Sequence, residues 1–180
     1  MTDNRWTSTS TPYLVPRAAG DTDAWTAEAA ALGRKGGQRV LHAGEEPASR
    51  EVAALLGLVA GEPVVARRRL IELDGEPHEL TDSYYPYDIA AGTPLAGTAR
   101  IRGGAVSVLA SLGHAGVRAT EHVTARMPDP GERDRLRTGE GEPVLRVARV
   151  TYDAAGRPVQ ADVMLMPAAR QQLRYEIGIG

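Results

Sequence analysis

Two arginines occupy matching places in this sequence. Arg69 follows the run Gly-Glu-Pro-Val-Val at 61–65, and Arg149 follows Gly-Glu-Pro-Val-Leu at 141–145. In the strands predicted below, alternation places both arginines on mostly apolar faces. A guanidinium on an inward face needs a carboxylate or a ligand anion, and its planar fork suits either. Both are therefore candidate anion contacts, with pairing to an internal carboxylate as the alternative.

Glu121 is a candidate for such an internal partner. It interrupts the apolar row of a predicted strand, between Ala119 and Val123. A carboxylate in that position needs a cation, so a structural salt bridge is favoured over contact with a ligand.

The two copies differ in side chains that could select a ligand. Thr81, Ser83 and Tyr85 share one face of a predicted strand, whereas the matching face in the second copy carries Asp162 and two methionines. A few oriented polar groups among apolar walls are typical of a ligand cleft. We expect the positions at which the two copies differ to determine which ligand binds. The alternative is a solvated edge strand that carries Thr and Ser.

A third anion-binding device is the start of a predicted helix at Gly103-Gly104. The free backbone N–H groups and the dipole of a helix start favour negative ligands, and glycines permit close approach. The pair matches no phosphate-loop signature, so a flexible connection is the alternative.

Motifs for catalysis are missing from the sequence. It has no Gly-x-Ser-x-Gly elbow, His-Glu-x-x-His, dinucleotide fingerprint or Walker loop. The four histidines lack metal-ligand spacing, and we expect neither a metal nor a cofactor. General acids need no motif, so Glu121 and Asp162 are the candidate acid and base if the chain is an enzyme.

Composition narrows the class of protein. The chain has 180 residues, of which 42% are apolar and 24% charged, which is typical of a soluble domain. A net charge of −2 gives no electrostatic case for direct binding to DNA. Cysteine is absent, and no apolar run reaches the roughly 20 residues that span a bilayer. With no basic and apolar leader, the expected location is the cytoplasm.

The elements that position these residues form two similar halves. Caps, stops and alternation predict a helix, a strand, a short helix and a hairpin in each half. The predicted ranges are 24–32, 38–43, 51–56, 64–73 and 77–85 in the first half, and 105–112, 117–127, 131–136, 144–152 and 158–166 in the second. Tight hairpins require antiparallel pairing, so the fold class is α+β with an internal pseudo-twofold duplication.

Residues 7–16 are expected to form an extended arm rather than a helix or a core strand, because Thr, Ser and Pro dominate them. The predicted organisation is therefore an arm over residues 1–20 and one ligand-binding domain over 21–180. A disordered tail is the alternative for the arm.

The ordered set of short motifs resembles the UTRA domain, the effector-sensing domain of HutC-type regulators in the GntR family. The matching stretches include Glu51–Leu58, Gly61–Val64, Asp74–Pro77, Ser83–Pro86 and Gly141–Val147. The resemblance covers about residues 21–177. It implies a chorismate-lyase-like fold, a pocket for sugar phosphates or organic acids, and a homodimer.

Departures from the family pattern bear on the ligand. Ile71 stands where a second arginine is common, and Thr81 and Gln160 replace frequent glutamates. These changes favour a less charged or more apolar ligand, anionic if the arginines bind it. The winged-helix DNA-binding domain that precedes this domain in the family is missing from the sequence. We expect a ligand sensor, with an enzyme performing elimination or cyclisation, or a dimerisation partner of full-length relatives, as alternatives.

Overall fold

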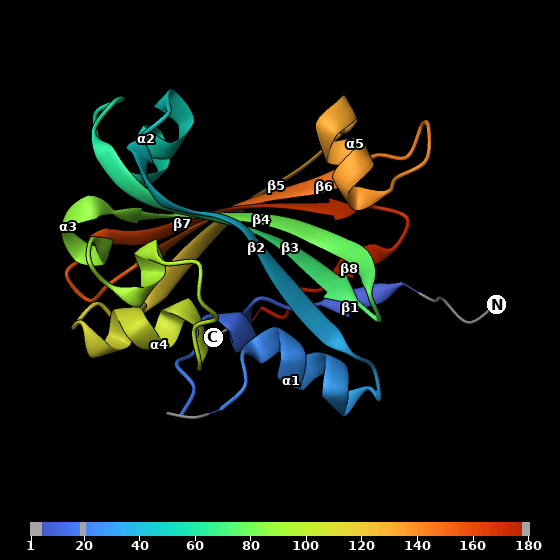
Figure 1. Ribbon diagram of the computed structural model, residues 1–180, viewed down its shortest axis with the longest axis horizontal. Helices are drawn as coiled ribbons and strands as arrows, with labels where there is room; N and C mark the ends of the chain where they lie inside the picture. Colours follow the sequence, from blue (N-terminus) through green and yellow to red (C-terminus); the bar gives the residue numbers. More distant parts are fainter. Residues whose placement is uncertain (1–4, 19–20, 178–180) are drawn as a thin grey trace.

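A six-stranded sheet organises the computed structural model, which describes residues 5–18 and 21–177 (Figure 1). Every neighbouring pair in it is antiparallel, which confirms the expected α+β class. The spatial order is β2 (Gly36–Pro47), β3 (Pro63–Leu73), β4 (Glu76–Pro86), β7 (Pro158–Pro167), β6 (Val144–Tyr152) and β5 (Arg118–Arg126).

The predicted duplication is present in the fold. Helix α4 (Gly104–Ser111) begins and ends 80 residues after α1 (Ala24–Ala31), and α5 (Pro130–Leu136) stands in the same relation to α2 (Arg50–Leu56). At the centre of the sheet Asp82 of β4 pairs with Val163 of β7. These two residues are each other's counterparts, because one residue is inserted before the second copy of this strand. A pseudo-twofold axis therefore passes between them.

Local signals explain the helices. Asp23 and Ser49 accept hydrogen bonds from the third residue of α1 and α2, at 2.9 and 3.1 Å. Gly57 ends α2 in the left-handed conformation, which glycine adopts without steric cost. Asp129 and Glu132 form a reciprocal capping box at the start of α5.

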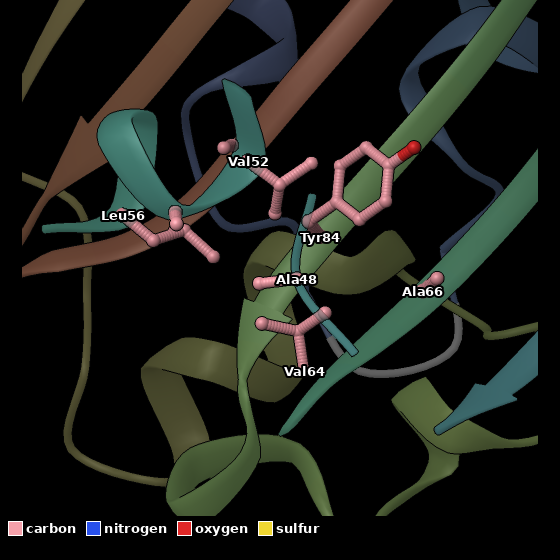
Figure 2. Packing of buried hydrophobic residues seen from close by; sticks show 8 residues of the cluster. Ala48, Val52, Leu56, Val64, Ala66 and Tyr84 are labelled. Carbon is pink, nitrogen blue, oxygen red and sulfur yellow. The ribbon is translucent and has the colours of Figure 1, made fainter. Parts of the chain in front are cut away.

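The helices cover both faces of the sheet. Helices α2 and α5 pack on one face, and α1, α4, α3 (Tyr87–Ala90) and the 3-10 turn η2 (Pro94–Ala96) lie on the other (Figure 1). Figure 2 shows part of the first layer, where α2 covers alternate residues of the strands. Its buried members include Val52, Leu56, Val64, Ala66 and Tyr84. The opposite face of the same strands carries the candidate functional site described below.

The N-terminal segment differs from the expected extended arm. It forms a strand, β1 (Trp6–Ser8), and a 3-10 turn, η1 (Thr11–Tyr13). Strand β1 pairs in parallel with β8 (Gln171–Leu173), and Trp6 is buried against Trp25 of α1. The pairing partner lies about 165 residues away in sequence, so local composition does not reveal it. Residues 1–4 and 19–20 of the predicted arm, and 178–180 of the predicted domain, lie outside the described residues.

Two further observations concern the surface. Val123 of edge strand β5 is exposed rather than packed in the core, as are Val117 and Met127, which flank that strand. Within residues 5–18 and 21–177, no helix combines the length and apolar character that crossing a membrane requires.

Candidate functional site

A cavity of about 150 Å³ lies on the face of the sheet that carries α1 and α4. Its walls come from β3, β4, β6 and β7, from the starts of α1 and α4, and from β1, η1 and β8. The two halves and both ends of the described chain therefore meet around one space, which is the seam that the duplication predicts.

Most of the predicted site residues line this cavity: Arg69, Thr81, Gly103, Gly104, Glu121, Arg149 and Asp162. Ser83 and Tyr85 do not line it, because both lie fully buried behind the lining. Strand β4 is central in the sheet, so the alternative of a solvated edge strand for Thr81, Ser83 and Tyr85 is wrong.

Ser83 links the two halves beneath the cavity. Its hydroxyl accepts a hydrogen bond from Arg69 Nη2 at 3.0 Å and donates to Asp162 Oδ1 at 2.5 Å. Gln160 Nε2 donates to both oxygens of Asp162, at 2.9 and 2.8 Å. Asp162 is thus held by neutral donors rather than by an arginine.

Arg149 and Glu121 form the internal pair that the sequence favours. Arg149 Nε lies 2.6 Å from Glu121 Oε1, and the two side chains are 10% and 11% exposed. Ser10 accepts a hydrogen bond from Arg149, and the Tyr175 hydroxyl donates to Glu121 at 2.8 Å. Burial alone raises the pKa of Glu121, but Ser10, Arg149 and Tyr175 outweigh it and lower that pKa.

Arg69 is the exception to this pairing, although it is the counterpart of Arg149. Glu121 of β5 lies opposite Arg149, whereas Val40 of β2 lies opposite Arg69. Among the residues that the structure describes, Arg69 has no carboxylate within ion-pair distance, and its Nε is buried without a hydrogen-bond partner. The two arginines that the sequence treats alike therefore differ in chemistry.

Arg67 is a cavity residue that the sequence reasoning did not single out. It is 4% exposed, and its guanidinium donates to the carbonyl oxygens of Gly97 and Ala99. Burial, followed by the nearby charge of Arg69, lowers the pKa of Arg67. Its place on the same strand face as Arg69 was the signal available in the sequence.

A β-bulge adds His78 and Glu79 to the cavity wall. Ile71 pairs with Glu79 but Glu72 pairs with Pro77, so His78 is an extra residue in β4. The second hairpin has the same irregularity, with Val159 as its extra residue. Strict alternation cannot place two neighbouring residues on one face, which is why both were missed.

The environment of these two residues suppresses charge. Burial, with smaller contributions from Arg34 and Arg170, lowers the pKa of His78 to about 4. Burial also raises the pKa of Glu79, although Thr81 and two arginines oppose the shift. The imidazole is therefore neutral at pH 7, whereas the charged form of Glu79 is disfavoured by burial and favoured by Thr81 and the two arginines.

The backbone N–H groups of the predicted glycine pair are not free to bind an anion. Gly103 and Gly104 both have left-handed backbones, with φ of 75° and 82°. Their N–H groups already donate to the carbonyl oxygens of Asp21 and Ile101, each at 3.2 Å. A side chain on Gly103 would meet the Ser107 hydroxyl at 3.1 Å, so glycine here permits close packing beside the cavity.

The N-terminal segment closes the cavity. Ser10, Tyr13 and Arg17 all line it. The Tyr13 hydroxyl donates to Glu28 of α1, and the Arg17 backbone N–H donates to Ser107 of α4 at 3.1 Å. Within the described residues, no group of three or more His, Asp or Glu side chains is arranged to hold a metal ion.

Comparison with known proteins gives a consistent result. The family model described as UTRA domain matches residues 31–172. An uncharacterized HTH-type transcriptional regulator of Streptomyces coelicolor is 31% identical over 166 residues, which cover 89% of this chain and 61% of the relative. One of Rhizobium meliloti is 30% identical over 144 residues, 79% of this chain and 58% of the relative. The chain thus spans about three fifths of these curated relatives.

Solved structures share the architecture. The effector domain of PhnF from Mycobacterium smegmatis has a TM-score of 0.74 at 22% identity, covering 91% of this chain and 98% of that one. The ligand-binding domain of a regulator assigned to the GntR family, from Bordetella bronchiseptica, has a TM-score of 0.70 at 26% identity, covering 79% and 92%. The chorismate-lyase-like fold class expected from the sequence is confirmed.

Proposed function

The chain belongs to the UTRA domain family, and we propose that it is the effector-binding domain of a HutC-type regulator of the GntR family. A small molecule enters the cavity, contacts Arg69, and shifts the relative populations of conformations of the domain. Transcription is then controlled through a DNA-binding domain, attached or separate, in the cytoplasm.

One observation carries this proposal. Arg69 faces a cavity at the seam of the two halves without a carboxylate partner among the described residues. An unpaired, half-buried guanidinium costs stability, and such a cost is retained where a ligand anion supplies the partner. Arg149, Thr81, Glu121, Asp162 and the glycine pair complete the proposed lining, with Ser83 and Tyr85 supporting it from behind.

The alternative of an enzyme has less support. Glu121 is held by Arg149 and Tyr175, and Asp162 accepts three hydrogen bonds from Ser83 and Gln160. Both carboxylates are therefore already engaged by protein groups, which leaves neither free to exchange a proton with a substrate.

The proposal is tested by thermal-shift screening against a panel of sugar phosphates, amino acids and carboxylic acids. We expect at least one compound to raise the melting temperature, and Arg69→Gln to abolish that rise. Arg68→Gln is the matched control, because Arg68 points to the other face and pairs with Glu46 at 2.6 Å. Full retention of the shift in Arg69→Gln would contradict the site, and turnover of the bound compound would contradict a pure sensor.

We also propose a homodimer in which a second copy covers the exposed apolar row at edge strand β5. Val123 of this strand is 43% exposed, and the residues that flank the strand, Val117 and Met127, are 66% and 49% exposed. Exposed apolar residues on an edge strand favour an interface between protein chains.

Sedimentation velocity tests the homodimer proposal. We expect a species of twice the 19.1 kDa chain mass, and dissociation in Val123→Lys because a charge would be buried at the interface. Thr124→Lys, on the opposite face of the strand, is the control and should remain dimeric. A parent protein that sediments as a monomer at 100 µM, or an unaffected Val123→Lys dimer, argues against this interface.

A further inference from the structure

Three aromatic rings form one wall of the cavity. Trp25 of α1 stacks on His78 of the bulge, with ring centroids 4.9 Å apart and an interplanar angle of 25°. Trp6 of β1 meets both rings edge-on, at 5.0 and 5.7 Å. We call these three residues the aromatic wall. It is continued by the apolar lining residues Ile71, Met164, Met166 and Leu173.

The aromatic wall carries polar atoms without partners. Trp6 Nε1 and His78 Nε2 are buried and have no hydrogen-bond partner, although their residues are only 6% and 5% exposed and line the cavity. By contrast, Trp25 Nε1 donates to the Glu72 carbonyl oxygen at 3.0 Å. A buried donor left unpaired costs free energy, so a bound molecule with a polar substituent at this wall would recover some of it.

The charges around the cavity favour one negative charge on the ligand. Arg149 is paired with Glu121, and Asp23 with Arg100. Among the described lining residues this leaves Arg17, Arg67 and Arg69 against Asp162 and Glu79, which is counted as charged because it accepts a hydrogen bond from the Thr81 hydroxyl. The excess is then one positive charge. A dianion would meet those two acids, whereas one carboxylate at Arg69 balances the excess.

On the basis of the proposed function, we propose that the effector is a compact, planar aromatic monocarboxylic acid. Its ring lies against Trp6, Trp25 and His78, and its carboxylate meets Arg69. The aromatic wall supplies edge and face contacts for a flat ring, and a guanidinium suits a carboxylate geometrically. Ile71, which lines the cavity and packs in one buried cluster with Trp6 and Trp25, keeps the ring end of the cavity apolar.

The two tryptophans are the only ones in the chain, and both are in the aromatic wall. Their indole N–H groups therefore give two cross-peaks in a ¹H–¹⁵N spectrum that report on this site alone, assigned with Trp6→Phe. The probes are benzoate, benzamide, cyclohexanecarboxylate, benzylamine and glucose 6-phosphate. Benzamide keeps the ring without the charge, and cyclohexanecarboxylate keeps the charge without the aromatic ring.

We expect benzoate to shift both indole peaks and to bind at least about tenfold more tightly than the other four probes, the effect of losing one charge-assisted contact. Arg69→Gln should weaken benzoate to the level of benzamide while leaving benzamide unchanged. Arg68→Gln should bind benzoate like the parent. If Arg69→Gln loses the dispersed indole peaks of a folded protein, Arg69→Lys replaces it, because it keeps the charge and removes the planar fork.

Several outcomes would overturn the ligand class. Equal affinity for benzoate and benzamide would show that the carboxylate charge does not contribute to binding. Equal affinity for benzoate and cyclohexanecarboxylate would show that the aromatic ring does not contribute. Tighter binding of glucose 6-phosphate, or a panel hit outside the aromatic acids with no response to benzoate, would leave the sensor proposal standing and reject this class. A panel and a probe set that both fail to bind would reject the sensor proposal as well.

Discussion

Arg149→Ala is expected to lower the free energy of unfolding by about 3–5 kcal/mol at pH 7, the usual cost of removing one partner of a buried ion pair. The variant leaves the Glu121 carboxylate, 11% exposed, without its cation. Tyr175 still donates to that carboxylate, which places the loss toward the lower end. Urea unfolding followed by circular dichroism measures the difference.

Arg146→Ala is the matched control for Arg149→Ala. Arg146 lies on the same strand but pairs with Glu51, whose side chain is 58% exposed, so the expected loss is below about 1 kcal/mol. In a double-mutant cycle, Glu121→Ala and Arg149→Ala together should cost less than the sum of the two single variants. Additive losses would mean that the pair contributes no coupling, and the distinction between Arg149 and Arg69 would lose its basis.

That distinction explains how a duplicated fold provides one ligand contact. Arg69 and Arg149 are equivalent in the sequence, and both were predicted as anion contacts. The strands beside them make them chemically different. Strand β5 supplies Glu121 opposite Arg149, whereas β2 supplies Val40 opposite Arg69. Arg149 is therefore satisfied by the protein, whereas Arg69 is available to a ligand.

The parts of the fold that local chemistry determines could be predicted from the sequence. The cap at Asp23, the left-handed stop at Gly57 and the turn at Asp74-Gly75 each act within a few residues. The hairpins and the four main helices follow from such signals, and the duplication then gives the antiparallel order.

The parts that depend on distant contacts or on an irregular strand could not be predicted. Trp6 needs the partner strand β8 at the other end of the described chain before it becomes a wall of the cavity. His78 and Glu79 reach the cavity together only because of the bulge, which breaks the alternation that sequence reasoning assumes. The polar contacts on the sheet were thus found more readily than the aromatic wall.

The aromatic wall should make the stability of the protein depend on pH. Burial lowers the pKa of His78 to about 4 in the folded protein, while an unfolded histidine has a pKa near 6.5. Above pH 6.5 both states are neutral and stability is full. As the pH falls from 6.5 towards 4, the unfolded state takes up the proton first, so stability is lost in this window. The loss from this one group is roughly 2 kcal/mol at pH 5.

The variant His78→Phe isolates this effect, because it keeps an aromatic ring beside Trp25 and removes the titrating group. Urea unfolding of both proteins at pH 8, 7, 6 and 5 should show the parent losing more stability than the variant below pH 6.5, by roughly 2 kcal/mol at pH 5. Carboxylates elsewhere affect both proteins and cancel in the difference. A separation between the two curves that stays constant from pH 8 to pH 5 would show that the imidazole is hydrated in the folded state. The wall would then be open to water, and a flat apolar ring would lose the dry surface on which its binding depends.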